Sequence, residues 1–131
     1  MKAHWFSNHV AYTIAKYGMS MCVLGMSEEF KGQNVAVNAL WPQTAIHTAA
    51  IEMLNGPESS KYARKPDIMA DAAYVILSKA PQQAPTGQFY IDEDVLSRAG
   101  IRDLTQYACD PSNADNLHQD FFLDSDIASK L

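Results

Sequence analysis

Residues 8–42 read NHVAYTIAKYGMSMCVLGMSEEFKGQNVAVNALWP. The first part of this stretch has apolar side chains at helical spacing and predicts one long helix, from about Asn8 to Lys31. Ser7 or Asn8 can cap its start, and Gly32 lies where a glycine commonly ends a helix. Because the helix is apolar nearly all round, we expect it to be buried nearly all round.

One face of this expected helix carries only small residues, at spacings of three and four. They are Ala11, Ala15, Gly18, Cys22 and Gly25. Each glycine inside a helix costs about 1 kcal/mol relative to alanine. Two glycines on one face therefore indicate close approach of another backbone, and an ordinary core helix that tolerates them is the alternative.

The chain continues as an alternation of strands and helices. Asn34–Leu40 predicts a strand buried on both faces, and Pro42 ends it because proline cannot continue a ladder. The later expected elements are a short helix over His47–Leu54, a loop or broken helix over Ser59–Arg64, a helix over Asp67–Lys79, a strand over Gly87–Asp92 and a short helix over Val95–Ala99. In the helix expected over Asp67–Lys79, Asp67 can cap the start, and four residues face inward: Ile68, Ala72, Val75 and Ile76.

This order is typical of an α/β fold with a parallel sheet. Two strands beside a helix that is apolar on every side do not complete a domain. Either the chain associates with copies of itself or with a partner, or half of the fold is missing.

Composition excludes several classes of protein. The 131 residues suffice for one small domain, and 47% of them are hydrophobic. Ten Lys and Arg against fifteen Asp and Glu give a net charge of −5, which argues against a nucleic-acid-binding surface. No apolar run is long enough for a membrane span, and the N-terminus lacks the apolar core of a secretory signal.

The cysteines and histidines give no metal or disulfide signal. Cys22 and Cys109 are typical of free thiols in a reducing compartment rather than of a disulfide framework. The four histidines show no metal-ligand spacing, so we expect no metal site.

Tyr12 and Lys16 lie one helical turn apart on the same face of the expected helix. A nearby positive charge favours the phenolate and so lowers the pKa of a tyrosine. Such a phenol can transfer a proton to a carbonyl or from an alcohol. A half-exposed helix face without chemistry is the alternative interpretation of the bare pair.

The surroundings of this pair carry a resemblance that covers nearly the whole chain. The segments that carry it are Ala11–Met21, Val37–Pro42, Thr44–Ala50, Asp67–Tyr74, Gly87–Glu93 and Asp120–Leu123. They resemble the short-chain dehydrogenase/reductase family, in which Tyr-x-x-x-Lys opens a long helix and the next strand reads Val-Asn-x-x-x-Pro-Gly. Within the family they look like the hydroxysteroid dehydrogenase-like group and its bacterial citronellol or citronellal dehydrogenase relatives.

The resemblance implies an α/β fold that is the C-terminal half of a Rossmann-like, doubly wound parallel sheet. About two strands with flanking helices are expected, so the domain is incomplete. Residues 1–131 would form a partial short-chain dehydrogenase/reductase domain, running from the catalytic helix to the last strand and followed by the acidic tail Asp110–Asp126.

The resemblance also implies roles for particular residues. Tyr12 is the general acid/base, and Lys16 holds the nicotinamide ribose and lowers the pKa of Tyr12. The loop Pro42–Thr48 lies over the nicotinamide of NAD or NADP, with the Ile46 backbone near its carboxamide. Thr48 reaches a cofactor phosphate.

Substrate recognition is expected from residues His47–Arg64, which correspond to the family's substrate lid. The implied substrate is a small hydrophobic alcohol or carbonyl compound. One departure is Gln43, where the family usually has glycine.

The family's glycine-rich phosphate loop has no counterpart among the six glycines of this chain, so only the nicotinamide half of the cofactor site is expected. The isolated chain is then expected to be inactive. A non-catalytic dimerisation or binding remnant that uses helix 8–31 as its interface, or a fragment of a split or truncated gene, is the alternative.

The sequence ends in Ser129, Lys130 and Leu131. A C-terminal Ser-Lys-Leu is an address read by the peroxisomal import receptor. A eukaryotic source therefore implies a peroxisomal protein, and any other source a cytoplasmic one.

Overall fold

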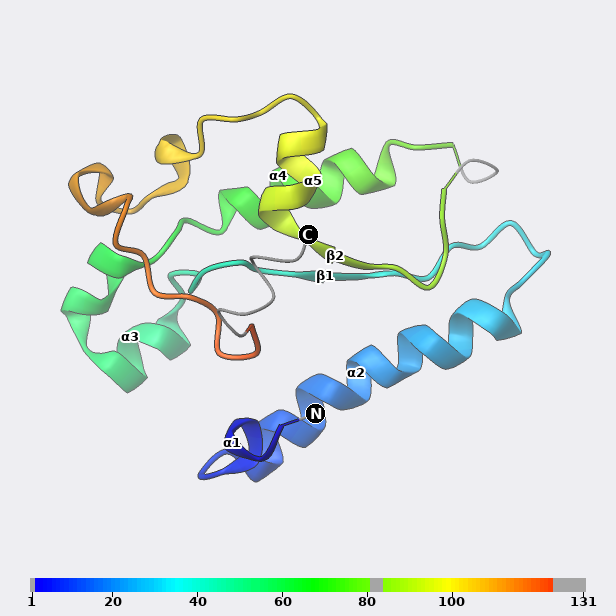
Figure 1. The fold of residues 1–131 in the computed structure, drawn as a ribbon, viewed down its shortest axis with the longest axis horizontal. Coiled ribbons are helices and arrows are strands. Elements are labelled where there is room, and N and C mark those ends of the chain that lie inside the picture. The colour runs from blue at the N-terminus through cyan, green and yellow to red at the C-terminus, as the bar shows by residue number, and fades with distance from the viewer. Residues whose placement is uncertain (1, 81–83, 124–131) are drawn as a thin grey trace. The chain divides into compact units, whose positions relative to one another are not determined.

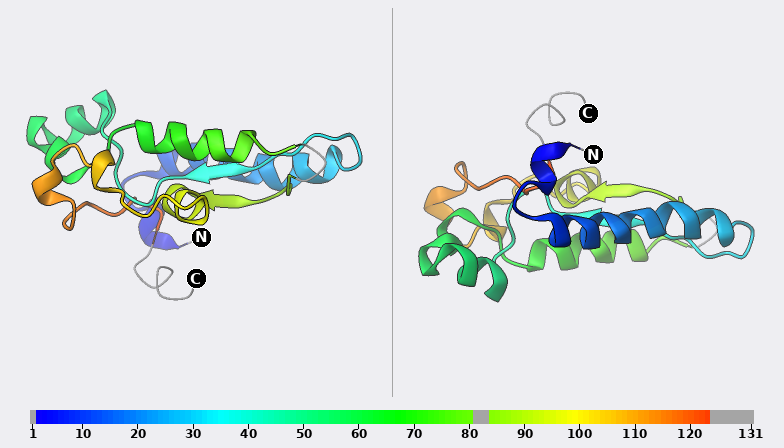
Figure 2. Two further views of the ribbon diagram at one scale, coloured as in Figure 1. Left: turned by 90° about the horizontal axis from the view of Figure 1, so that it is seen from above. Right: turned by 90° about the horizontal axis from the view of Figure 1, so that it is seen from below.

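The computed structural model describes residues 2–80 and 84–123. Two short strands, β1 (Ala39–Trp41) and β2 (Phe89–Ile91), lie side by side among helices and run in the same direction (Figures 1 and 2). The chain divides into two compact units, one of residues 1–39 and 79–90 and one of residues 40–78 and 91–131. Two of the three division points fall inside β1 and β2, and the third follows residue 78; we call these parts unit 1 and unit 2.

The register of the two strands is set by side chains as well as by backbone. The Ala39 N–H donates to the Gln88 carbonyl at 2.9 Å. The Asn38 amide nitrogen donates to the Pro85 carbonyl, and its oxygen accepts from the Gln88 N–H, both at 2.9 Å. Asn38 therefore joins the two chain segments just before β1 and β2 begin.

The strand predicted over 34–40 is present, but its start at Asn34 and its burial on both faces are wrong. Regular pairing begins only at Ala39, and Val35 is exposed. The sheet formed by the described residues has two strands, so the segment before β1 has no neighbouring strand on its other edge. The predicted end at Pro42 is confirmed, since β1 stops at Trp41.

Unit 1 consists mainly of α1 (Ala3–Phe6) and the long helix α2 (Val10–Glu29). Neither Ser7 nor Asn8 caps α2, because Asn8 has a φ of +66° and His9 takes the N-cap position without a side-chain bond. Instead, the buried Thr13 hydroxyl donates to the Trp5 carbonyl and joins the two helices. Helix α2 ends at Glu29 with Phe30 as its C-cap, two residues before the predicted end at Lys31, and Gly32 follows in the next turn with a φ of +82°.

The predicted burial of α2 on nearly every side is also wrong. Its buried positions are one polar-rich face: Thr13, Ser20, Val23 and Ser27. Most of its large apolar side chains are exposed, and Ile14 retains 59% of its surface. The described residues supply packing for one side of the helix, and this leaves the remaining sides uncovered.

The stripe of small residues does not make the expected close approach within the described chain. At about 100° per residue the stripe lies opposite the buried face. A Cβ built at Gly18 or Gly25 meets no described atom within 4 Å. The tight glycine contact of unit 1 is at Gly87, where a Cβ would lie 3.1 Å from the Ser27 hydroxyl oxygen and φ is +71°.

Unit 2 carries the remaining helices. They are α3 (Ala49–Asn55), the 3-10 helix η1 (Pro57–Tyr62), α4 (Asp67–Leu77), α5 (Asp92–Arg98) and the short 3-10 helices η3 (Thr105–Tyr107) and η4 (Pro111–Asn113). Helices α4 and α5 pack against each other, and Ile68 and Leu96 are fully buried. These two helices supply half of the buried apolar residues described in the unit: Ile68, Ala72, Val95 and Leu96.

The inward face of α4 is largely as predicted. Ile68 and Ala72 are fully buried, and Val75 and Ile76 are half-buried. The predicted cap is wrong, because Asp67 is the first helical residue and Pro66 occupies the N-cap position.

The segment after α5 is anchored rather than only solvated. Tyr107 and Ala108 are buried, and the Phe122 ring packs edge-on against Trp41 with centroids 6.1 Å apart. Phe122 therefore anchors this segment within unit 2. Residues 124–131, with the predicted import signal Ser129–Leu131, lie outside the described residues.

No helix within residues 2–80 and 84–123 has the length and hydropathy needed to cross a bilayer. Across the same ranges, no three His, Cys, Asp or Glu side chains gather as metal ligands.

Candidate active site

The predicted proton-transfer pair is on α2 in unit 1. Tyr12 and Lys16 are one turn apart, and the Lys16 Nζ lies 5.6 Å from the centroid of the Tyr12 ring. Tyr12 is half-exposed, with 52% of its surface accessible. The phenol and the ammonium therefore share one accessible face of a regular helix.

The predicted nicotinamide loop, Pro42–Thr48, is in unit 2 and is held by backbone hydrogen bonds on one side to Arg64. The Ala45 carbonyl accepts from the Arg64 N–H at 2.9 Å, and the His47 N–H donates to the Arg64 carbonyl at 2.7 Å. This gives a parallel bridge between Ile46 and Arg64.

The segment before Phe122 holds the same loop from another side. The Ala45 N–H donates to the His118 carbonyl at 2.8 Å, and the Asp120 N–H donates to the Gln43 carbonyl at 3.0 Å. An antiparallel bridge joins Thr44 and Gln119. Although Gln43 replaces the family's usual glycine, the loop path is thus fixed by pairing on two sides.

Alternate amides of this loop are used in these contacts. Gln43, Ala45 and His47 donate, whereas the N–H groups of Thr44 and Ile46 form no hydrogen bond with any described residue. Backbone N–H groups are obligatory donors. The Ile46 N–H is therefore available for a carbonyl such as that of a carboxamide.

Thr48 begins α3. Its hydroxyl oxygen accepts from the Ile51 N–H at 3.4 Å, as an N-cap residue does. The hydroxyl keeps its own proton to donate. A cap role and the predicted phosphate contact are therefore chemically compatible.

Two buried charged residues near the loop were missed by the sequence interpretation. Asp92 is fully buried at the start of α5, and its Oδ1 accepts from the Gln43 and Glu93 N–H groups, both at 2.8 Å. Burial raises the pKa of Asp92, and the two backbone bonds oppose that effect. Arg64, 8% exposed, forms an ion pair with Glu93. The only signal in the sequence for Asp92 was its place as an acidic residue at the end of the predicted strand Gly87–Asp92.

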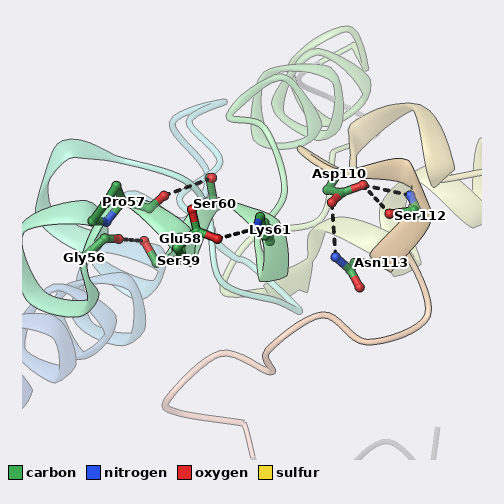
Figure 3. Close-up of polar contacts among 9 residues, drawn as sticks. All are labelled: Gly56, Pro57, Glu58, Ser59, Ser60, Lys61, Asp110, Ser112 and Asn113. Carbon is green, nitrogen blue, oxygen red and sulfur yellow. Dashed lines mark hydrogen bonds and ion pairs between the residues drawn. The ribbon is translucent and has the colours of Figure 1, made fainter.

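The polar residues of η1 and η4 make local contacts (Figure 3). Lys61 pairs with Glu58, which raises the pKa of Lys61, while Asp110 accepts from Ser112 and Asn113. The hydroxyls of Ser59 and Ser60 bond to carbonyls three residues earlier. These contacts stabilise turns and give no catalytic geometry.

The predicted substrate lid, His47–Arg64, contains α3 and η1 and is attached to the tail at its far end. The Tyr62 and His118 rings stack with centroids 4.8 Å apart and an interplanar angle of 9°. Met53 and Leu54 on α3 are strongly exposed. The lid thus presents apolar side chains while its end is held in place.

Tyr12 and Lys16 belong to unit 1, and Pro42, Ile46 and Thr48 belong to unit 2. Each set forms a defined local arrangement within its own unit. Their roles stay predictions.

Comparison with curated proteins gives relatives that share one name. The chain is 63% identical over 120 residues to "Hydroxysteroid dehydrogenase-like protein 2" of Xenopus laevis and 58% identical over 120 residues to the protein of that name in Homo sapiens. Each match covers 92% of this chain but only 28% of the relative. The chain thus spans little more than a quarter of the length of these relatives.

Solved structures of dehydrogenases also match the chain. A putative dehydrogenase from Xanthomonas campestris matches with a TM-score of 0.85 and 47% identity, over 95% of this chain and 44% of that one. A short chain dehydrogenase from Mycobacterium thermoresistibile matches with a TM-score of 0.79 and 40% identity, over 95% of this chain and 43% of that one. No model of a protein family matches the chain.

Proposed function

The chain is a homologue of hydroxysteroid dehydrogenase-like protein 2 and a partial short-chain dehydrogenase domain, and from this we propose that it forms the proton-transfer and nicotinamide-binding part of an NAD(P)-dependent oxidoreductase. The observation that carries the proposal is the Tyr12–Lys16 pair on the accessible face of α2. The homology agrees with it.

In the proposed reaction Tyr12 moves the proton. Its phenolate oxygen takes the hydroxyl proton of the alcohol as the carbonyl bond forms, and its phenol returns that proton to the carbonyl oxygen in the reverse direction. Lys16 places a positive charge beside the ring, which favours the phenolate. When bound, NAD(P) supplies the acceptor or donor of the hydride.

The residues expected to hold the nicotinamide fit that role. The Ile46 N–H is an unused donor suited to the carboxamide oxygen, and the Thr48 hydroxyl keeps a proton to donate to a phosphate. Lys16 would bind the ribose hydroxyls, as the family resemblance implies.

A hydrophobic alcohol or carbonyl compound is the proposed substrate. Met53 and Leu54, on the predicted lid, are exposed apolar side chains that could bury an aliphatic chain. The support combines the lid position, which the family resemblance implies, with the exposure of these two side chains.

The test measures reduction of NAD⁺ and NADP⁺ by the enzyme as its source makes it, with primary aliphatic alcohols of increasing length. We expect kcat/KM to rise with chain length with one of the two dinucleotides. Absence of both dinucleotide binding and turnover would overturn the proposal. Residues 1–131 expressed by themselves are expected to show no turnover, because they contain no glycine-rich phosphate loop.

The second candidate function is a non-catalytic dimerisation module, and the exposed outer faces of α2 favour it. In either case we propose that a second copy of the chain covers the small-residue face around Gly18 and Gly25, which lies opposite the helix's own packed face. Sedimentation velocity tests this. Gly18→Leu should dissociate the assembly, and an unchanged sedimentation coefficient would exclude this face.

Two further proposals concern the polypeptide in its source. Ser129, Lys130 and Leu131 support recognition by a peroxisomal import receptor. An immunoblot against the tail then tests whether these 131 residues are a fragment: a band near twice their size would mean that they belong to a complete dehydrogenase, and a band at their own size would mean a stand-alone product.

A further inference from the structure

The contact between Asp92 and Gln43 joins residues 49 positions apart in unit 2. The same carboxylate oxygen, Oδ1, also accepts from the adjacent Glu93 N–H, which is a local turn contact. Asp92 is fully buried, and its Oδ2 has no hydrogen-bond partner among the described residues. One oxygen of a buried carboxylate therefore carries all its described hydrogen bonds.

Burying a carboxylate is unfavourable unless hydrogen bonds compensate for the lost hydration. The bond to the Glu93 N–H lies within one turn at the start of α5, whereas the bond to the Gln43 N–H joins another segment of the chain. The feature that the local turn does not explain is thus the bond to the loop.

Gln43 is the second residue of the loop that begins at Pro42. Arg64 and the segment around His118 bind the middle of this loop through backbone atoms, so substitutions at Asp92 leave those bonds in place. At Gln43 itself, the carbonyl accepts from the Asp120 N–H, whereas the Asp92 side chain is the one acceptor for the Gln43 N–H among the described residues.

We propose that Asp92 is a positioning residue for cofactor binding, which fixes the start of the Pro42–Thr48 loop through the Gln43 N–H and thereby orients the Ile46 N–H. This inference rests on the proposed function, in which the Ile46 N–H binds the nicotinamide carboxamide. Asp92 itself touches neither cofactor nor substrate in this account.

Three variants test the long-range bond. In Asp92→Ser the shorter side chain cannot reach the Gln43 N–H, whereas Asp92→Asn keeps an acceptor oxygen for both N–H groups. Asp94→Ser, on the same turn of α5, is the matched control, because the Asp94 side chain makes no hydrogen bond or ion pair with another of the described residues.

Two quantities are measured in the full-length natural enzyme and its variants. The first is the rate of hydrogen exchange at the backbone amides from Gln43 to His47, and the second is the KM for the dinucleotide, compared with kcat. Asp92→Ser should speed exchange at Gln43 by about tenfold or more and raise the dinucleotide KM by about tenfold, with kcat changed less. Asp92→Asn and Asp94→Ser should stay within about threefold of the wild type in both.

Exchange and KM within twofold of the wild type in Asp92→Ser would overturn the positioning role. If the wild-type enzyme binds no dinucleotide, the proposed function fails and exchange alone decides the inference. Faster exchange at Gln43 in Asp92→Ser but not in Asp94→Ser then supports the structural contact, and equal exchange in both contradicts it.

Discussion

Helix α2 in unit 1 and helix α4 in unit 2 both carry many apolar side chains, but they bury different residues. In α4 the buried positions are apolar, with Ile68 and Ala72 fully inaccessible. In α2 the buried face is mostly small and polar, with Thr13 fully inaccessible, while Ile14 remains exposed.

The two helices differ in burial because different parts of the chain are available to pack against each of them. Helix α4 packs against α5 of the same unit, so its pattern of apolar residues corresponds to its burial. For α2, the described residues cover one side only. Apolar residues on a helix predict that a surface is covered, but they do not identify the surface or the chain that covers it.

The largest expected effect compares the same substitution in both helices. Ile68→Ala should lower the free energy of unfolding by about 2–5 kcal/mol at every protein concentration, since the contacts of Ile68 lie within unit 2. Ile14→Ala should lower the free energy of unfolding by less than about 0.5 kcal/mol in dilute protein, and by more at protein concentrations at which copies associate. Urea unfolding of both variants at a low and a high protein concentration measures these losses. An equal loss for Ile14→Ala and Ile68→Ala at the low concentration would contradict the comparison.

A smaller effect is expected at the tightest contact of unit 1. Gly87→Ala should cost about 2 kcal/mol, because an alanine at φ +71° is strained and its Cβ approaches the Ser27 hydroxyl oxygen. Gly100 of unit 2 has a φ of +92° and open space around it. Thermal unfolding of Gly100→Ala therefore reports the backbone strain alone, and equal losses in the two variants would show that the Ser27 contact adds nothing.

In unit 2, Tyr107→Phe should cost about 1 kcal/mol, because it removes the 2.7 Å hydrogen bond to Asp71. Burial and this bond raise the pKa of Tyr107 to about 12, above the value of about 10 for an unfolded chain. The stability from the neutral phenol is complete below pH 10 and is lost as the pH rises towards 12. Unfolding free energies from pH 9 to 12 should show this decline in the wild type but not in the variant.

No measurable effect is expected from the exposed pair on η1. Glu58→Gln removes the ion pair with Lys61, and both side chains are accessible to water. The melting temperature should stay within error of the wild type. A clear decrease would show that η1 is covered in the protein in solution and that unit 2, like α2, has an unidentified neighbour.

Sequence patterns predicted what depends on neighbouring residues in the chain. The turn at Gly32, the inward face of α4 and the one-turn spacing of Tyr12 and Lys16 all follow from local geometry. Long-range contacts left no such pattern: nothing near Gln43 indicates that Asp92 will accept from its N–H. The burial of α2 failed for a related reason, because a helix with apolar residues on all sides does not show which side the chain itself will cover.

The central claim is that Tyr12 transfers the proton. It is tested most directly by kcat and by the dinucleotide dissociation constant of Tyr12→Phe, measured beside Tyr74→Phe, whose tyrosine is exposed on α4. The account predicts that Tyr12→Phe lowers kcat by about 100-fold or more and leaves dinucleotide binding within a few-fold, with Tyr74→Phe like the wild type. A Tyr12→Phe enzyme that retains kcat within twofold of the wild type would contradict it.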